Sequence, residues 1–570
     1  MRRRKKNFSK KDISPDEIFL DAENMPDFNR ESFEGMIEKA IIPDSALIMA
    51  AVFGLVLAAL FLRVGILQLN QGEAFYQRAK ENRLHLTPLF PERGVIYDRR
   101  GLELAWNGVS SNEIIRVYAD LPGLSHLLGY LGFLPEKELA EGDFDWQSKY
   151  GRQGLEKGLD IFLRGKRGRR LIEVDSLGKI ISESVQQSPE NGANVILSID
   201  AEMQSKLFEK IQNTVKDRGF KGGAGIVMNP QNGEILAITS WPEYDLNAFS
   251  RGEAEKLPFF LNSEEKPLFF RAVSGLYPPG SIIKPIIALA ALKEGIIDKD
   301  RFIFSAGSIA VANPYDPDKN SVFYDWKAHG WVDLKKALAV SSNVYFYTIG
   351  GGFEEIGGLG VSRLKKYFEM FGLGKKTGLE FLAEEAGFVP DPEWKEKYFS
   401  DKVWRLGDTY NLSIGQGWLE ATPLQMAAAA SMISRNGEKF KPRVVKEMIF
   451  ADGKNVSLAA GSERVDIEEK YFQIVKEGMK MAVEEGTAKM LSDLGIGIAA
   501  KTGTAQIGGG KVDSWLVAFA PYNDPRLVLT IVLEGGNADN LVGAPFAGRQ
   551  FFEWVVLNRP EYLAVDNGVD

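Results

Sequence analysis

The sequence predicts an α+β protein with one membrane-spanning helix near its N-terminus, an elongated β-rich region and a larger mixed domain. Three observations support this prediction. An uncharged apolar run covers 45–62 and continues after Arg63 as VGILQL, which is long enough for a bilayer-spanning helix. Short strand and turn patterns fill 70–195. The remainder begins and ends with strands and has helices between them, which is typical of one α+β domain.

The composition excludes several kinds of chemistry. The chain has 570 residues, 45% hydrophobic and 26% charged, which is an ordinary globular composition. Its net charge of −8 argues against nucleic-acid binding. There is no cysteine, and the only histidines are His85, His126 and His329. Disulfides, thiolate nucleophiles and cysteine-ligated zinc are therefore excluded, and we expect any catalysis to use hydroxyls, amines or carboxylates.

The apolar segment 45–69 is predicted to anchor the chain in a membrane. A buried core helix normally keeps a polar stripe, and a signal peptide normally has a shorter apolar region. The tail 1–44 begins with MRRRKK and also carries Lys10 and Lys11, so the positive-inside rule predicts a cytoplasmic tail. Roughly 500 of the 570 residues would then lie outside the cytoplasm.

The β-rich region, 70–195, contains three recognisable patterns. The segment 93–105 (RGVIYDRRGLELA) is typical of a strand, a turn and a second strand. The segment 151–168 is interpreted as a capped helix between glycine-rich turns. The segment 169–181 is interpreted as a hairpin.

The remainder, 196–560, is predicted to form one domain, with a C-terminal tail at 561–570. Asp200 is a candidate N-cap, because apolar residues repeat every four positions after it. Asn232-Gly233 lies between two β-rich runs and indicates a hairpin. Strands are expected again near the end of the domain, at 496–501, 514–520 and 527–534.

Ser-x-x-Lys is a mechanistic motif, because residues i and i+3 share a helix face and the amine can reach the hydroxyl. The chain has at least four matches: Ser176/Lys179, Ser263/Lys266, Ser281/Lys284 and Ser362/Lys365. Ser281 stands out because Pro278-Pro279-Gly280 precedes it and an apolar, strongly helical run follows. Inside a helix, Pro285 would clash with the Ser281 carbonyl. We therefore expect the helix to begin at about Ser281.

A hydroxyl at a helix N-terminus lies where N–H groups and the positive end of the dipole favour developing negative charge. The same dipole end and the apolar surroundings are expected to lower the pKa of Lys284 towards that of a usable base. The alternative interpretation is a serine N-cap with a solvated lysine.

Two further motifs follow in order. Ser341-Ser342-Asn343 is a Ser-x-Asn triplet, which also occurs at Ser110/Asn112 and Ser434/Asn436. Lys501-Thr502-Gly503-Thr504 follows the strand-like run GIGIAA, and a second match, Lys376-Thr377-Gly378, lies in a glycine-flanked loop. The spacing favours the first set, since Ser341 lies 60 residues after Ser281 and Lys501 lies 160 residues after Ser341.

With these motifs the sequence resembles the penicillin-binding proteins and serine β-lactamases, whose active sites carry S-x-x-K, S-x-N and K-[ST]-G. Other segments resemble class B penicillin-binding proteins: RGVIYDRRGLELA, GLEKGLDIFLRG, LSIDAEMQ, SGLYPPGSIIKP, SIGQGWLEATPLQMA and DSWLVAFAP. YPPGSIIKP, DWKAHG and GDTYNLSIGQG are most similar to penicillin-binding protein 2, the elongation-type transpeptidase. The resemblance implies a pedestal domain of the dimerisation type at 70–195. It also implies a transpeptidase domain, an antiparallel sheet with helices, at 196–560.

The resemblance implies a serine acyl-enzyme mechanism that β-lactams inhibit. Ser281 would attack the penultimate D-Ala carbonyl of a peptidoglycan stem peptide. Lys284 would accept its proton, and Ser341 would relay a proton to the departing D-Ala amine. The backbone N–H groups of Ser281 and Thr504 would form the oxyanion hole.

The same resemblance implies the substrate-binding residues. Asn343 would hold a substrate amide and contact Lys284. Lys501 would present a positive charge to the substrate carboxylate, with the Thr502 and Thr504 hydroxyls as donors. Gly503, without a Cβ, would let the strand approach the substrate closely.

Partners and location are also implied by the resemblance. The partners are stem peptides on lipid-linked precursors or nascent glycan strands, β-lactams, a membrane-embedded glycosyltransferase and elongation-complex proteins, but no nucleic acid. The location is the bacterial inner membrane, with the N-terminus cytoplasmic and the catalytic domain periplasmic.

No cofactor or metal is expected. Some relatives carry zinc near the S-x-N motif on carboxylates, a histidine and a cysteine. Asp325 and His329 are present here, but Leu338 stands three residues before Ser341 and the chain has no cysteine. His329 is therefore interpreted as structural.

Two other functions remain open: a division-type class B transpeptidase, and a non-catalytic penicillin-binding scaffold or sensor. A bifunctional class A enzyme would need more than the approximately 125 residues between the anchor and the transpeptidase domain. A β-lactamase would need a deacylation base, and no Glu-x-x-Leu-Asn element follows Asn343. Only about 20 residues separate 93–105 from SHLLGYLG, so the head of the pedestal is expected to be reduced.

Overall fold

A computed structural model describes residues 43–110, 113–135, 137–138, 148–175, 177–251, 257–313, 316–458, 461–540 and 542–564. The chain divides into two compact units. The first runs up to Thr87 and includes Arg170–Ser184, and the second consists of Pro88–Arg169 and the chain from Val185 onward. Nearly all of the predicted tail 1–44 and residues 565–570 of the predicted C-terminal tail lie outside the described residues. So do Ser176 and Asn112 of the alternative motif matches.

The apolar segment of the first unit is one long helix, α2 (Pro43–Asn70), of 28 residues. At 1.5 Å per residue this helix is long enough to cross a bilayer, and no part of its most apolar window is buried by the protein. The segment predicted at 45–69 therefore fits a single-pass membrane anchor. The helix is followed by α3 (Gly72–Arg83), and three strands in the order β1-β7-β8 form a small sheet: β1 (Leu84–Leu89), β7 (Gly168–Val174) and β8 (Ile180–Gln187).

The second unit is built on a five-stranded antiparallel sheet with the order β11-β10-β22-β21-β20. The strands are β10 (Gly222–Met228), β11 (Ile235–Trp241), β20 (Ala499–Gly508), β21 (Lys511–Ala520) and β22 (Leu527–Asn537). β10 and β11 form the hairpin predicted around Asn232-Gly233. β21 and β22 contain the strands predicted at 514–520 and 527–534, whereas β20 begins at Ala499, three residues after the start predicted for the strand at 496–501. β20 lies at the edge of the sheet and carries Lys501.

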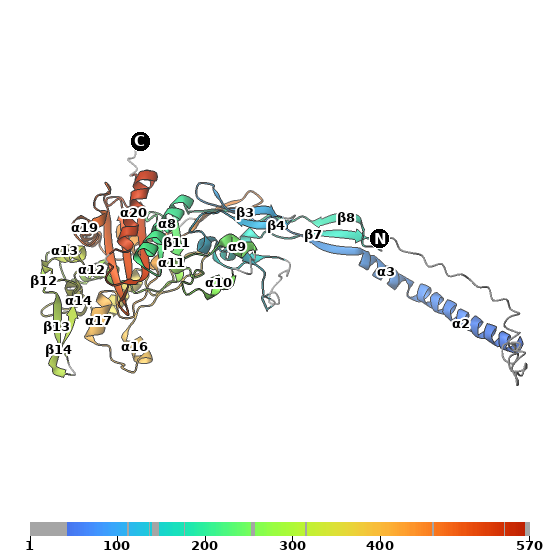
Figure 1. The fold of residues 1–570 in the computed structure, drawn as a ribbon, viewed down its shortest axis with the longest axis horizontal. Helices are drawn as coiled ribbons and strands as arrows, with labels where there is room; N and C mark the ends of the chain where they lie inside the picture. The colour runs from blue at the N-terminus through green and yellow to red at the C-terminus, as the bar shows by residue number, and fades with distance from the viewer. Residues whose placement is uncertain are drawn as a thin grey trace, which may run out of the picture. The chain divides into compact units, whose positions relative to one another are not determined.

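Helices cover both faces of this sheet (Figure 1). On one face, α8 (Ala201–Arg218) and α20 (Ala544–Asn558) bury apolar side chains against the strands. On the other face lie α12 (Lys284–Lys293) and α18 (Pro423–Ser434). The predicted N-cap of α8 is confirmed, since the Asp200 carboxylate accepts hydrogen bonds from two backbone N–H groups at 3.1 Å. The predicted α+β fold class is likewise confirmed.

A second sheet, in the order β18-β17-β9-β2-β3-β4, joins early and late parts of the chain. Its strands are β2 (Ile96–Tyr97), β3 (Glu103–Ser110), β4 (Glu113–Tyr118), β9 (Asn194–Leu197), β17 (Val445–Ile449) and β18 (Asn455–Ser457). β2 and β3 are the two strands predicted in 93–105. β3 and β4 form a hairpin that occupies most of the short interval before SHLLGYLG.

The single helix predicted in 151–168 is wrong. The structure has two short helices, α6 (Gly154–Gly158) and α7 (Asp160–Leu163). Gly158 ends the first, and a Cβ at this position would lie 1.8 Å from the Phe381 carbonyl oxygen. The break falls at Leu159, which has a φ of −101° and a ψ of 7°. The missing side chain at Gly158 allows the Phe381 backbone to pack closely beside this turn.

The chain between β11 and β20 supplies most of the motif-bearing elements. These are η2 (Gly280–Ile283), β12 (Ile303–Ser305), β13 (Ser308–Asn313), β14 (Asp316–Tyr324), β15 (Gly330–Val332), α13 (Leu334–Val340), α14 (Asn343–Gly351) and α19 (Glu469–Glu484). The remaining elements of the second unit are α4 (Ser125–Leu128), β5 (Leu131–Gly132), β6 (Tyr150–Gly151), α9 (Leu246–Arg251), α10 (Leu257–Asn262), α11 (Arg271–Ser274), α15 (Gly360–Met370), α16 (Pro392–Tyr398), α17 (Leu406–Ser413), β16 (Glu438–Phe440), β19 (Ser462–Arg464), η3 (Lys489–Leu491) and η4 (Pro560–Tyr562).

Candidate active site

The Ser-x-x-Lys motif at Ser281 lies where the chain enters α12. Ser281 is part of the 3-10 turn η2, and the α-helix itself begins at Lys284 with Pro285 in its first turn. Proline has no N–H to donate, and the Ser281 carbonyl accepts a hydrogen bond from the Lys284 N–H instead. The predicted helix start is therefore correct, but the first turn is a 3-10 turn. The tighter turn leaves Ser281 half-buried and Lys284 fully buried.

Backbone contacts hold this turn in place. Gly280 has a φ of +58°, and a Cβ there would lie 3.2 Å from the Thr504 carbonyl oxygen. Its N–H donates to the Gly415 carbonyl at 2.9 Å. Gly415, in the SIGQG segment, has a φ of +75°, and a Cβ on it would come within 2.2 Å of the Gly280 oxygen. Two glycines are therefore required for the close approach of this loop to the serine turn.

Lys284 is the centre of a buried polar cluster. Its Nζ donates to Asn343 Oδ1 at 2.7 Å and to the Ser341 carbonyl at 2.8 Å, and it lies 3.3 Å from Ser341 Oγ. Burial lowers the pKa of Lys284 to about 7, against the opposing effect of the Asp325 charge. The predicted lowering of this pKa is confirmed. Among the described residues no hydrogen bond joins Lys284 Nζ to the Ser281 hydroxyl.

Ser341 adopts a conformation that is uncommon for a residue with a side chain. Its φ of +59° and ψ of +40° lie in the left-handed region, which costs of order 1–3 kcal/mol and is concentrated at functional sites. It ends α13, and the next residue, Ser342, is the N-cap of α14. This sharp reversal places Ser341 Oγ between the amine nitrogens of Lys284 and Lys501.

Lys501 reaches the same hydroxyl from the edge strand β20. Its Nζ donates to Ser341 Oγ at 2.8 Å and to the Thr502 carbonyl at 2.9 Å. The side chain is fully buried, and burial, with the nearby Lys284 charge, lowers the pKa of Lys501 well below its ordinary value. One cluster therefore unites side chains from α12, the α13–α14 turn and β20. Its first and last members, Lys284 and Lys501, are more than 200 residues apart in the chain.

The rest of the Lys-Thr-Gly-Thr motif follows the alternation of a strand. Lys501 and Gly503 are buried on one face, while Thr502 is half-buried and Thr504 is exposed on the other. A Cβ on Gly503 would lie 3.1 Å from the Pro279 carbonyl oxygen, so β20 packs directly on the segment that precedes Ser281. Thr502 Oγ1 bonds to Thr487 Oγ1 at 2.7 Å, and the exposed Thr504 faces solvent.

The residues near the S-x-N motif do not fit the zinc site of some relatives. Asp325 already accepts hydrogen bonds on both carboxylate oxygens. His329 Nε2 lies 3.8 Å from Asp325 Oδ1, and no third His, Cys, Asp or Glu completes a metal-binding group within the described part of the chain. Burial lowers the pKa of His329, with the Asp325 charge acting in the opposite direction. These described residues therefore do not form a zinc site of that kind.

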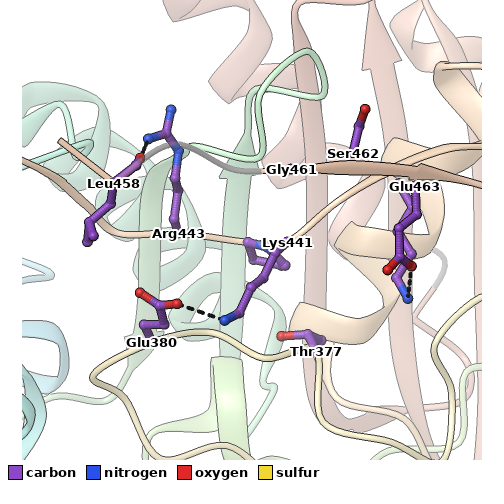
Figure 2. A pocket seen from close by; sticks show the side chains of 10 residues that line it. Thr377, Glu380, Lys441, Arg443, Leu458, Gly461, Ser462 and Glu463 are labelled. Atoms are coloured by element: carbon purple, nitrogen blue, oxygen red, sulfur yellow. Dashed lines mark hydrogen bonds and ion pairs between the residues drawn. The ribbon is translucent and has the colours of Figure 1, made fainter.

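The second Lys-Thr-Gly match lies elsewhere and has a structural role. Glu384 accepts hydrogen bonds from the N–H and hydroxyl of Thr377 and from the N–H of Gly378. Thr377 lines a pocket of about 620 Å³, shown in Figure 2, which contains none of the three selected motifs. Lys441 in this pocket is paired with Glu380 at 2.7 Å. Because the polar groups of Thr377 and Gly378 are paired with Glu384, we interpret the loop 376–378 as structural.

Three contacts of the cluster were not anticipated from the sequence. Thr487 bonds to Thr502, and the Phe346 ring centre lies 5.3 Å from Lys284 Nζ. Asp325 accepts a hydrogen bond from the Val344 N–H at 3.0 Å. The local sequence around Asp325 indicates only a possible metal ligand and none of these contacts. They depend on which segments the fold brings together.

Comparison with known proteins agrees with this architecture. The family model for the penicillin binding protein transpeptidase domain matches 223–551, more than half of the chain, and the model for the penicillin-binding protein dimerisation domain matches 106–197. The chain therefore belongs to the penicillin-binding protein transpeptidase family.

Within that family the chain is similar to penicillin-binding protein 2. It is 28% identical to the peptidoglycan D,D-transpeptidase MrdA of Haemophilus influenzae, over 88% of this chain and 90% of that protein. Its fold matches penicillin-binding protein 2 of Pseudomonas aeruginosa, crystallised with WCK 5153, with a TM-score of 0.71 and 29% identity, over 85% of this chain and 99% of the other. A chain of a peptidoglycan synthase complex that coordinates polymerization and crosslinking matches with a TM-score of 0.72 and 26% identity, over 92% and 99%.

Proposed function

We propose that this protein is a monofunctional, elongation-type peptidoglycan D,D-transpeptidase that cross-links stem peptides through a serine acyl-enzyme. One observation carries the proposal: Lys284, Ser341, Asn343 and Lys501 form one hydrogen-bonded cluster beside the turn that carries Ser281. The similarity to a peptidoglycan D,D-transpeptidase over most of that protein's length also supports the proposal.

In the acylation step Ser281 Oγ attacks the carbonyl carbon of the penultimate D-Ala. Lys284 accepts the serine proton, because an amine with a pKa of about 7 is about half neutral at neutral pH, whereas an ordinary lysine is almost entirely protonated. Unliganded sites often have long catalytic hydrogen bonds that tighten when substrate binds, and we expect this of the Ser281–Lys284 pair. The backbone N–H groups of Ser281 and Thr504 would stabilise the oxyanion, each by about 3 kcal/mol.

Collapse of the tetrahedral intermediate breaks the C–N bond to the terminal D-Ala. Ser341 would donate its hydroxyl proton to the departing amine and be reprotonated by Lys284 or Lys501, both within hydrogen-bonding distance of Ser341 Oγ. An ester links the peptide to Ser281. The amine of a neighbouring stem peptide then attacks this ester, which forms the new amide cross-link and releases the serine.

Asn343, Lys501, Thr502, Gly503 and Thr504 are the proposed substrate-binding residues. A peptide aligned along the free edge of β20 would contact Gly503 and Thr504. Thr504 is exposed and is therefore accessible to such a peptide. Burial lowers the pKa of Lys501, and a substrate carboxylate beside its amine would raise that pKa again, since a nearby negative charge favours the charged form. The Thr502 hydroxyl would have to exchange its bond with Thr487 for one with substrate.

Location and partners form part of the proposal. The N-terminal helix would anchor the protein in the bacterial inner membrane, with a cytoplasmic tail and a periplasmic catalytic domain. We retain the domain boundaries 45–69, 70–195 and 196–560. A membrane-embedded glycosyltransferase and further elongation-complex proteins are the proposed partners, since a similar chain belongs to a complex that couples polymerization to crosslinking.

The central experiment is intact-mass analysis of the purified full chain with and without a labelled penicillin, beside Ser281→Ala. We expect a stable penicilloyl adduct on the wild-type protein and none on the variant. Slow hydrolysis of the adduct would exclude a β-lactamase. A folded wild-type protein that forms no adduct would favour the non-catalytic scaffold instead.

Orientation can be tested because the chain has no native cysteine. Two variants, Ser9→Cys in the tail and Ser457→Cys at an exposed position, each introduce a single cysteine. Intact cells that produce either variant are treated with a membrane-impermeant maleimide. We expect labelling of Ser457→Cys only, whereas labelling of Ser9→Cys alone would reverse the proposed topology.

A further inference from the structure

Asp325 is a buried carboxylate that holds the start of α14. Its side chain is completely inaccessible to solvent. Oδ2 accepts hydrogen bonds from Ser342 Oγ at 2.8 Å, the Val344 N–H at 3.0 Å and Ser305 Oγ at 3.2 Å. Oδ1 accepts from the Trp326 N–H at 2.9 Å. A carboxylate in this position satisfies N–H groups of the first helical turn and interacts favourably with the helix dipole.

The residues that Asp325 holds are the immediate neighbours of the catalytic cluster. Ser342 and Val344 flank Asn343, whose Oδ1 accepts the 2.7 Å hydrogen bond from Lys284. Ser342 also follows the left-handed Ser341, whose hydroxyl lies between the two lysines. A turn containing a strained residue persists only where surrounding contacts over-determine it, and Asp325 supplies several of these contacts.

We propose that Asp325 is a positioning residue of this enzyme, which holds the Ser341–Asn343 turn against Lys284 by direct hydrogen bonds and without a metal ion. This inference rests on the proposed function and adds to it a residue outside the three motifs. Asp325 does not touch the reacting atoms. It acts through the side chains of Ser341 and Asn343.

An asparagine cannot reproduce these contacts. The carboxylate accepts a backbone N–H on each oxygen, from Trp326 and Val344. A carboxamide has one acceptor oxygen and one NH₂ donor, so either orientation directs its NH₂ at a backbone N–H. Asp325→Asn therefore removes the charge and one of these hydrogen bonds, while the side-chain volume is nearly unchanged.

The charged groups around Lys284 determine how this variant changes the pH dependence. Asp325 raises the pKa of Lys284, whereas the neighbouring Lys501 and any protonated His329 are unfavourable to a charged Lys284. Loss of the Asp325 charge lowers the pKa of Lys284 further. The acidic limb of the acylation rate should then move to lower pH.

The experiment measures the second-order rate constant for acylation by a fluorescent penicillin between pH 5 and 9. It uses the full chain as wild type, Asp325→Asn and Ser342→Ala. We expect Asp325→Asn to acylate at least about tenfold more slowly, since small displacements of catalytic groups have effects of this size. Its acidic limb should lie at lower pH. Ser342→Ala removes the hydrogen bonds of the Ser342 hydroxyl to Asp325, Ser305 and the Tyr345 N–H but no charge. Its rate should therefore fall while its acidic limb stays in place.

Three results would overturn the proposal. The first is Asp325→Asn with the wild-type rate and pH profile. The second is stoichiometric zinc in the purified wild-type protein by elemental mass spectrometry, with acylation lost on chelation. The third applies if Asp325→Asn does not fold: it is a wild-type acylation rate for Ser342→Ala. Absence of any penicillin adduct on the folded wild-type protein would instead refute the proposed function itself. That outcome is distinct from a difference between the variants and the wild type.

Discussion

Lys284, the proposed general base, shows how the surroundings of one side chain change its chemistry. A lysine is normally protonated at neutral pH, but this one is completely buried, and burial lowers its pKa to about 7. Its Nζ still has three oxygen partners, from Ser341 and Asn343. Of these partners the Ser341 carbonyl and the Asn343 amide oxygen only accept hydrogen bonds and hold the amine in place, whereas the Ser341 hydroxyl can also take a proton on from it.

The acylation rate should therefore follow the deprotonation of Lys284. Only the neutral amine accepts the Ser281 proton, so the rate constant should rise with pH with a midpoint near 7. Two pH units below the midpoint it should be about 100-fold lower than on the plateau. Because Lys501 lies in the same cluster, the midpoint belongs to the pair of lysines. The measurement is stopped-flow acylation by a labelled penicillin across pH 5–9.

A rate constant independent of pH over this range would contradict the assignment of Lys284 as the base. Lys284→Arg is the control, since arginine stays protonated. It should give no adduct at any pH in the range.

At the scale of elements, the site depends on contacts between backbones. The serine turn η2 lies against the edge strand β20 and against the SIGQG segment after α17, and glycines occupy the closest contacts. Trp515 on β21 donates its Nε1–H to the Pro278 carbonyl at 3.1 Å. The position of Ser281 is thus set by three segments that follow it in the chain by more than 100 residues.

Substitution of Gly415 should reduce acylation more than its effect on stability alone would explain. Gly415→Ala introduces a methyl group 2.2 Å from the Gly280 oxygen, so the turn that carries Ser281 must move. We expect a fall of about 100-fold in the acylation rate. The alanine also pays about 1–2 kcal/mol for the left-handed conformation.

Gly295 offers a matched control for this comparison. It has a φ of +66°, but no atom lies within 4 Å of a Cβ placed there. In denaturant unfolding Gly295→Ala should show only the loss of stability that comes from the left-handed conformation, and it should keep a wild-type acylation rate. Equal acylation rates for the two variants would contradict a role for the Gly415–Gly280 contact.

At the scale of the whole molecule, the apolar helix and the catalytic cluster belong to different compact units. α2 exposes large side chains such as Leu55 and Phe61, each more than 70% accessible. Every motif residue lies in the second unit, which has its own apolar core. An exposed apolar surface of this extent is stable only in lipid or detergent.

Removal of residues 1–70 should therefore change partitioning without changing chemistry. In a detergent phase-separation assay we expect the full chain in the detergent phase and the truncated chain in the aqueous phase. The truncated chain should keep its penicillin acylation rate within about twofold, because no motif residue lies in the removed segment. A truncated chain that remained in the detergent phase would show that another surface binds lipid.

The sequence by itself determined the local features of this protein. Hydrophobic periodicity and caps indicated α8 with its Asp200 cap, Asn232-Gly233 indicated the first hairpin, and Pro285 indicated where α12 begins. Each of these depends on a few neighbouring residues. The order of the three motifs, with the surrounding segments, also identified the family. The misassigned helix in 151–168 shows the limit of local signals, since its break at Leu159 lies beside Gly158, where the distant Phe381 backbone packs closely.

Only the tertiary structure decided how the site is assembled. The left-handed conformation of Ser341, the pairing of Thr502 with Thr487, and the four hydrogen bonds of Asp325 have no local signal. They exist because α13, α14, β20 and the loop after β14 are packed together by a core distributed over the second unit. The pKa values of Lys284 and Lys501 arise in the same way, since burial and neighbouring charges are properties of the packed molecule.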